Sequence, residues 1–167
     1  MGNKKYLIGL LAVSAAFFTG LMQYEGFRAK PYRDTGGVPT IGIGSTQYED
    51  GTRVKMTDAP INKARAVEIA RVHVSKDEAA FRQSLQGVAL SQTEYDLYLD
   101  FVYQFGQGAW SRSSMRRLLM QGKHRQACDA LLKWKYAGGK DCSVRSNGCY
   151  GVWTRQLARY QQCVGVN

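Results

Sequence analysis

Two carboxylates and a hydroxyl, those of Glu25, Asp34 and Thr40, lie in one short stretch near the start of this 167-residue chain. Splitting an acetal such as a glycosidic bond needs such a set. One carboxyl must give a proton to the leaving oxygen, and the other must hold an attacking water or the developing cation. Most single Asp and Glu residues are simply solvated on the surface. The hydroxyl and the glycine-rich segment GGVPTIGIGST around it favour a catalytic site.

Local patterns predict a helix-to-hairpin turn that would bring these groups together. An uncharged, largely apolar run ends just before Glu25. After it, TIGIGS at residues 40–45 alternates Ile with Gly as a short hairpin strand would, and Gly36-Gly37 is the predicted turn.

The rest of the chain is predicted to be mostly helical. A helix at about residues 60–85 carries Val67, Ala70 and Val74 on one face. The capping box SQTE at 91–94 opens the next helix, whose Tyr95, Leu99 and Val102 should point inward. Shorter helices follow at about 114–121, 126–136 (with Trp134) and 152–164, the last with Trp153, Leu157 and Tyr160 on its buried face.

Four cysteines are confined to the C-terminal part of the chain. Cys142 and Cys149 bracket a turn-forming segment, SVRSNG, and Cys128 and Cys163 lie on helices that must pack together. We therefore expect disulfides between 142 and 149 and between 128 and 163, although four cysteines allow three pairings and free buried thiols are an alternative. Without a CxxC pair, a zinc site is not expected. Disulfides would indicate an oxidising compartment.

The sequence resembles the phage-type lysozymes, glycoside hydrolase family 24, the family of the T-even phage lysozymes. The spacing of Glu25, Asp34 and Thr40 carries the resemblance, together with DFVYQFGQGAW at 100–110 and the C-terminal segments KWKYAGGKDCSVRSNGC and GVWTRQLARYQQC. The likeness covers about residues 21–163. It implies an α+β, mainly α, two-lobed fold, with a hairpin lobe at about 25–60, a linking helix at about 60–85 and a helical lobe at about 86–167.

The resemblance also implies roles for single residues. Glu25 would be the general acid, and Asp34 and Thr40 would position the attacking water. Gln104 would contact the saccharide. The reaction would be that of an inverting muramidase and would need no cofactor or metal. Four positions depart from the family pattern. Ser45 replaces a His, Gln104 stands where many members have Asn, and Gln156 and Arg159 replace the second Arg and the Glu of RRxxE.

The N-terminal run from Tyr6 to Tyr24 is 19 residues long, follows Lys4 and Lys5, and is just long enough to cross a bilayer as a helix. Seven of its residues are Gly, Ala, Ser or Thr, so it is weakly apolar for a permanent anchor. These features resemble the signal-arrest-release segment of some endolysins. We expect residues 1–24 to tether the protein in the inner membrane of a Gram-negative host before release to the periplasm. A cleaved signal peptide and a soluble core helix are the alternatives.

The net charge of +10 indicates an anionic partner or a solvated basic surface. Peptidoglycan, whose stem peptides carry carboxylates, fits that partner. The basic residues form no nucleic-acid motif, so nucleic acid is not expected, and the protein is expected to be a monomer. Its passage would involve the host export machinery and the inner membrane transiently.

The sequence therefore predicts a phage endolysin that cuts β-1,4 bonds between N-acetylmuramic acid and N-acetylglucosamine and lyses the host cell. A membrane-permeabilising basic protein and a non-catalytic cell-wall-binding module are alternative hypotheses. Substitution of Glu25 would separate the first hypothesis from the other two.

Overall fold

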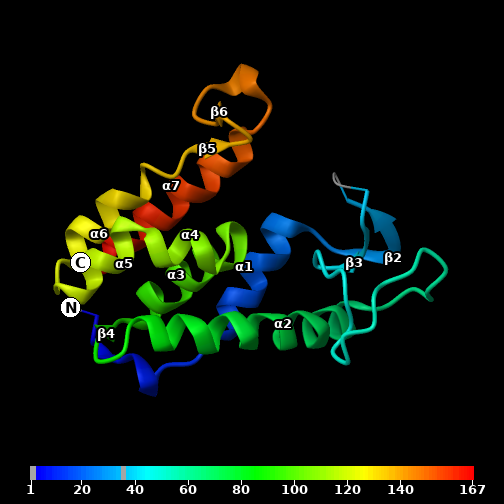
Figure 1. Ribbon diagram of the computed structural model, residues 1–167, viewed down its shortest axis with the longest axis horizontal. Helices are drawn as coiled ribbons and strands as arrows, with labels where there is room; N and C mark the ends of the chain where they lie inside the picture. The colour runs from blue at the N-terminus through cyan, green and yellow to red at the C-terminus, as the bar shows by residue number, and fades with distance from the viewer. Residues whose placement is uncertain (1–2, 35–36) are drawn as a thin grey trace. The chain divides into compact units, whose positions relative to one another are not determined.

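The computed structural model describes residues 3–34 and 37–167, and its fold is mainly helical with small antiparallel sheets (Figure 1). The predicted fold class is confirmed. The α-helices are α1 (Ala15–Glu25), α2 (Lys63–Ser84), α3 (Gln92–Phe105), α4 (Gln107–Arg112), α5 (Ser114–Met120), α6 (His124–Leu131) and α7 (Tyr150–Gly165), with 3-10 turns η1 (Ile8–Leu10) and η2 (Arg145–Asn147). The strands are β1 (Tyr6–Leu7), β2 (Arg28–Arg33), β3 (Pro39–Gly42), β4 (Ala89–Leu90), β5 (Tyr136–Ala137) and β6 (Lys140–Asp141).

The chain divides into two compact units. One unit, here called the hairpin unit, is Ser14–Ala79. The other, the helical unit, combines Ala80–Asn167 with the N-terminal residues up to Val13. The boundary at residue 79 falls inside α2, which therefore contributes to both units.

In the hairpin unit, strand β3 packs closely on α2. Ile41 and Ile43 are fully buried, as are Ile69 and Ala70 of the helix. Gly42 between the two isoleucines has φ +68°, and a Cβ there would come within 3.0 Å of Ala66 Cβ. Only glycine meets both conditions without strain, so this residue sets how closely the hairpin lies on the helix.

In the helical unit, the core is built from aromatic rings. Phe81 packs edge-on against Tyr95, and the indole of Trp110 contacts Phe81, Tyr98 and Phe101. Helix α3 supplies three of these rings, those of Tyr95, Tyr98 and Phe101, and a capping box fixes where the helix begins. The Ser91 hydroxyl accepts from the Glu94 amide, and the Glu94 carboxylate accepts from the Ser91 amide. This capping box confirms the prediction.

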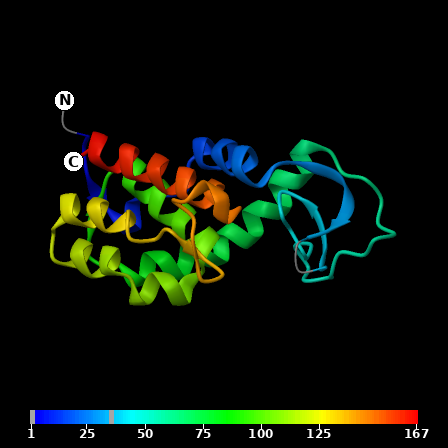
Figure 2. The same ribbon diagram turned by 90° about the horizontal axis from the view of Figure 1, so that it is seen from above.

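Helix α7 lies along α3 and α6 (Figure 2), but it buries a different face from the one predicted. Its buried side chains include Arg155, Gln156 and Arg159, whereas Trp153, Leu157 and Tyr160 are only half-buried. The reason is a carboxylate on α3. Asp100 accepts hydrogen bonds from Arg155 Nη2 at 2.6 Å and from Arg159 Nε at 2.7 Å.

The region before the last helix also differs from expectation. Helix α6 ends at Leu131, so Trp134 lies in the turn that follows the helix. The Trp134 ring packs edge-on against Phe101, with centroids 4.8 Å apart, and the chain then enters the β5–β6 hairpin. Tertiary packing of the indole therefore overrides the helical pattern of this segment.

Both disulfides join the pairs expected from the sequence. Cys128 of α6 is bonded to Cys163 of α7, and Cys142 is bonded to Cys149 across the turn before α7. Each disulfide closes a loop within the helical unit, with sequence separations of 35 and 7.

The N-terminal run from Tyr6 to Tyr24 is divided between the two units. Residues up to Val13 form β1 and η1 in the helical unit, and α1 belongs to the hairpin unit. Within residues 3–34 and 37–167, none of the helices has the length and apolar character needed to cross a membrane. Five of the run's side chains, those of Ile8, Leu11, Phe17, Phe18 and Leu21, are buried in this structure.

Candidate active site

Glu25 is the last residue of helix α1 and is exposed. The Ser14 hydroxyl caps the start of the helix by accepting from the Phe17 amide at 3.3 Å. Gly26 ends it with φ +74°, and its amide donates to the Met22 carbonyl at 3.0 Å. A positive φ of this kind favours glycine, so the chain leaves α1 for strand β2 immediately after the carboxylate.

Asp34 and Thr40 are held by the main chain of a single residue, Val38. The Val38 amide donates to Asp34 Oδ1 at 2.8 Å, and the Asp34 amide donates back to the Val38 carbonyl at 3.0 Å. The Thr40 hydroxyl donates to the same carbonyl at 2.9 Å. Asp34 is half-buried and Thr40 is 2% exposed, so both groups have restricted freedom. Of the predicted turn at Gly36-Gly37, Gly36 lies outside the described residues.

Tyr32 is influenced by the charges of both Glu25 and Asp34, and it was not identified from the sequence. It pairs with Thr40 across the β2–β3 ladder. Burial raises the pKa of its phenol, the guanidinium of Arg28 lowers it, and the negative charges of Glu25 and Asp34 both raise it. The Arg28 guanidinium lies 4.4 Å from the ring centroid. Both carboxylates therefore act on one phenol, and a tyrosine two residues before Asp34 is the signal that sequence reasoning overlooked.

The chemistry available to this hairpin follows from its hydrogen bonds. Because the Thr40 hydroxyl gives its only proton to Val38, its oxygen can act only as an acceptor toward another molecule. The Asp34 carboxylate is also an acceptor when ionised. Two such acceptors on one hairpin can orient the protons of a water molecule, and Glu25 on the preceding element can supply a proton.

Gln104 lies in the other unit, near the C-terminal end of α3. Its Oε1 atom is buried and has no hydrogen-bond partner within residues 3–34 and 37–167. A buried acceptor without a partner costs about 1 to 3 kcal/mol, so native proteins keep few of them without a role.

The fold and the site define a glycoside hydrolase of the lysozyme class. A family model described as phage lysozyme matches residues 22–164, and the chain belongs to the phage lysozyme family. The match includes Glu25, Asp34 and Thr40 and most of both units.

Relatives with similar sequences and structures agree with this assignment. The endolysin of Salmonella phage P22 is 33% identical over 129 residues, which cover 77% of this chain and 87% of the relative. A protein named SAR-endolysin from Escherichia phage 933W is 29% identical over 160 residues, covering 93% and 89%. Among solved structures, the endolysin of Escherichia coli O157:H7 phage FAHEc1 superposes with a TM-score of 0.80 at 26% identity, covering 95% of this chain and 96% of that one.

Proposed function

We propose that this protein is a phage endolysin that hydrolyses the β-1,4 bond between N-acetylmuramic acid and N-acetylglucosamine in the peptidoglycan of a Gram-negative host. The observation that carries the proposal is that Asp34 and Thr40 both bind the main chain of Val38. On the same hairpin, the charges of Glu25 and Asp34 both raise the pKa of the Tyr32 phenol. The family membership supports the same reaction class.

In this mechanism Glu25 is the general acid. It gives its proton to the glycosidic oxygen as the bond to the anomeric carbon breaks, and positive charge develops on the sugar ring. Asp34 and Thr40 hold a water that attacks the anomeric carbon from the face opposite the leaving sugar. The product has inverted configuration and a reducing N-acetylmuramic acid end. An anhydro end would instead indicate a lytic transglycosylase.

Gln104 is proposed to contact the saccharide. Its unsatisfied Oε1 is suited to accept from a hydroxyl or an acetamido N–H group. Replacement by Leu, which removes the polar group, should raise KM more than it lowers kcat if the contact serves binding.

Replacing Glu25 tests the catalytic assignment. Because Glu25 is exposed, Glu25→Gln should leave folding intact, yet the amide cannot donate the required proton. Turnover of peptidoglycan should fall by about 10² to 10⁴, the usual share of acid–base catalysis, while binding to cell wall persists. Glu68→Gln, at a carboxylate that is 62% exposed on α2, is the matched control. Near wild-type turnover of the Glu25 variant would refute the assignment, and lysis that survives with no bond cleavage would favour a membrane-permeabilising protein.

The proposal also includes a membrane-tethered stage before release to the periplasm. Relatives named SAR-endolysin support this route, as do the uncharged run from Tyr6 to Tyr24 and the two lysines before it. While that run spans the inner membrane as a helix, α1 cannot take its place in the hairpin unit and Glu25 stays at the membrane surface. The tethered protein is therefore inactive. After release, Phe17, Phe18 and Leu21 become buried in the folded protein, and Glu25 takes its position at the end of α1, just ahead of the β2–β3 hairpin.

Two glycines in the run allow a direct test of this stage. A Cβ at Gly9 or Gly20 would meet no atom within 4 Å, so both positions have room for the start of a side chain, and leucine at both makes the run more apolar. Ser14 is kept because it caps α1. The Gly9→Leu, Gly20→Leu variant should stay in the inner-membrane fraction and delay lysis. Gly151→Leu, at an equally open glycine of α7, is the control. Equal solubility and lysis timing for both would contradict the tethered stage.

A further inference from the structure

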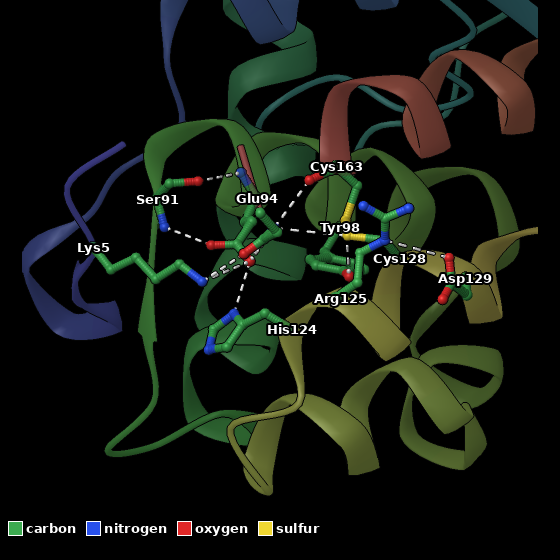
Figure 3. Close-up of a disulfide and its surroundings, with 10 residues drawn as sticks. Lys5, Ser91, Glu94, Tyr98, His124, Arg125, Cys128, Asp129 and Cys163 are labelled. Atoms are coloured by element: carbon green, nitrogen blue, oxygen red, sulfur yellow. Dashed lines mark hydrogen bonds and ion pairs between the residues drawn. A yellow bond between two sulfur atoms is a disulfide. The ribbon is translucent and has the colours of Figure 1, made fainter. Parts of the chain in front are cut away.

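Glu94 is a fully buried carboxylate at the start of α3, and it is surrounded by donors (Figure 3). Its Oε2 atom accepts from the Ser91 amide at 2.8 Å. Its Oε1 atom accepts from His124 Nδ1 at 2.7 Å, and the Lys5 ammonium lies 3.5 Å away. The capping box explains the first bond, but helix capping requires neither the histidine nor the lysine.

The last residue of the chain completes this cluster. Asn167 Nδ2 donates to Glu94 Oε1 at 2.9 Å and to the Cys163 carbonyl at 3.0 Å, and the same nitrogen lies 3.7 Å from Cys128 Sγ. Asn167 Oδ1 accepts from Lys5 Nζ at 2.6 Å. The Cys128–Cys163 disulfide therefore adjoins the amide that holds both Glu94 and Lys5.

Lys5 begins the segment of residues 5–12, here called the N-terminal segment, which is docked along the helical unit. Strand β1 pairs with β4, with Tyr6 opposite Leu90, and the Ile8 amide donates to the Val88 carbonyl at 2.9 Å. Gln92 Nε2 donates to the Ala12 carbonyl at 2.9 Å, and Ile8 and Leu11 are buried. In both Figure 1 and Figure 2 the start of β1 lies beside the end of α7.

We propose that Glu94, His124 and Asn167 form a preformed binding site for the N-terminal segment, and that capture of the Lys5 ammonium there fixes the released form of the protein. This inference rests on the proposed membrane-tethered stage for its biological meaning. The occupant is the chain's own segment, and the ligand chemistry is a primary ammonium followed by an extended strand.

The position of Lys5 makes this contact specific to release. Lys5 precedes the run from Tyr6 to Tyr24, and Glu94 follows it. While the run spans the bilayer, the two residues lie on opposite sides of the membrane and cannot meet. Their ion pair forms only after the whole segment has left the bilayer on the side of the folded protein, so it opposes reinsertion.

The donors around Glu94 compensate its buried charge even before the N-terminal segment docks. A buried carboxylate is costly unless donors compensate it, and three donors, from Ser91, His124 and Asn167, belong to the same folded part as Glu94. Lys5 adds the fourth and is the one contributed by the N-terminal segment. Little ordering of the site is then required when the segment docks, which favours capture.

Two neighbouring lysines provide a matched experiment. Lys5→Gln removes the docking ammonium, whereas Lys4→Gln removes an equal charge from the same flank of the run. In the purified released protein, hydrogen exchange at residues 6–12, including the Ile8 amide, should become about fivefold faster for Lys5→Gln, as expected for loss of about 1 kcal/mol. It should stay at the wild-type rate for Lys4→Gln. Equal rates in both variants would overturn the proposed site, whether or not the protein is ever tethered.

A double-mutant cycle and a cell fractionation complete the test. Because Asn167 holds both Lys5 and Glu94, Asn167→Ala should also speed exchange of the segment, and adding Lys5→Gln should have little further effect. Fully additive effects would show that Asn167 and Lys5 act separately, against the proposal. In host cells, Lys5→Gln should leave more protein in the inner membrane than Lys4→Gln does. Equal partition would show that the docking site does not oppose reinsertion.

Discussion

Asp34 and Thr40 are bound to opposite polar groups of one peptide residue, Val38. The Asp34 carboxylate accepts a hydrogen bond from the Val38 amide at 2.8 Å, and the Thr40 hydroxyl donates one to the Val38 carbonyl at 2.9 Å. The two side chains are thereby fixed relative to each other through the main chain of Val38. Any change at Val38 that alters the turn should therefore disturb both.

Asp34→Asn should separate charge from geometry. The asparagine carbonyl oxygen can still accept from the Val38 amide, so the turn should persist, but the side chain no longer carries a negative charge. We expect turnover of peptidoglycan to fall by about 10² or more, with an unchanged melting temperature. Steady-state kinetics and thermal unfolding by circular dichroism measure the two quantities. Wild-type turnover would remove Asp34 from the proposed mechanism.

Thr40→Val should lower both turnover and stability, because valine keeps the volume but has no hydroxyl. The Val38 carbonyl loses the hydroxyl donor and keeps the Asp34 amide, which costs about 0.5 to 1.5 kcal/mol, and the water loses an acceptor. Turnover should fall by roughly 10- to 100-fold. Thr40→Ser is the control, since it retains the hydroxyl and should keep most of the activity. If serine and valine are equally impaired, the methyl group rather than the hydroxyl is the important part of Thr40.

Asp100→Asn should strongly destabilise the helical unit. Burial alone would raise the pKa of this carboxyl, but the guanidinium groups of Arg159 and Arg155 lower it below its usual range. Removing the charge leaves two nearly buried guanidinium groups uncompensated, which typically costs about 3 to 5 kcal/mol. Urea unfolding of the variant measures the loss. Asp129→Asn breaks an exposed pair with Arg125 and should cost no more than about 1 kcal/mol; a similar small cost at Asp100 would contradict the network's importance.

Removal of the Cys142–Cys149 disulfide should lower stability without abolishing catalysis. Its closed loop is short, with a sequence separation of 7, so the chain-entropy model gives roughly 2 to 3 kcal/mol, or about 5 to 10 °C in Tm. The Cys142→Ser, Cys149→Ser variant and calorimetry test this. The exported wild type should also weigh two hydrogens less per disulfide before reduction. Alkylation of all four cysteines without reductant would exclude the pairing.

The Glu94 carboxyl should contribute to stability in a defined range of pH. Burial would raise its pKa, but hydrogen bonds from His124, the Ser91 amide and Asn167 outweigh burial and hold the pKa at about 2. Because this value is below the ordinary one of 4.5, the contribution is complete above about pH 4.5 and is lost as the pH falls toward 2. The Lys5 ammonium and the His124 imidazole face Glu94, and the Tyr98 phenol lies close by.

Glu94→Gln should therefore unfold with less dependence on acid. The difference in unfolding free energy between wild type and variant should be on the order of 3 kcal/mol at neutral pH and should shrink steadily below pH 4.5. Urea unfolding across this pH range gives the curve, with Glu68→Gln as a surface control. A difference that is constant with pH would show that the Glu94 charge is not what stabilises this cluster.

Several features of this protein were determined by short stretches of sequence. The spacing of Glu25, Asp34 and Thr40 identified the family and the candidate site. The SQTE capping box located the start of α3, and the turn residues between Cys142 and Cys149 indicated a local disulfide. In each case the interacting groups are a few residues apart, so local backbone geometry decides the outcome and the pattern can be recognised directly.

Tertiary structure decided the features that depend on partners distant in sequence. The face that α7 buries follows from Asp100 on another helix, so its amphipathic pattern pointed to the wrong side chains. The N-terminal run read as one apolar helix, yet its first half pairs with β4 and its second half forms α1, because two different units supply the packing. Glu94 read only as a capping residue, and its contacts with Lys5 and Asn167 span 89 and 73 residues. Burial and charge pairing over such separations leave no local pattern, and only the folded chain brings these groups together.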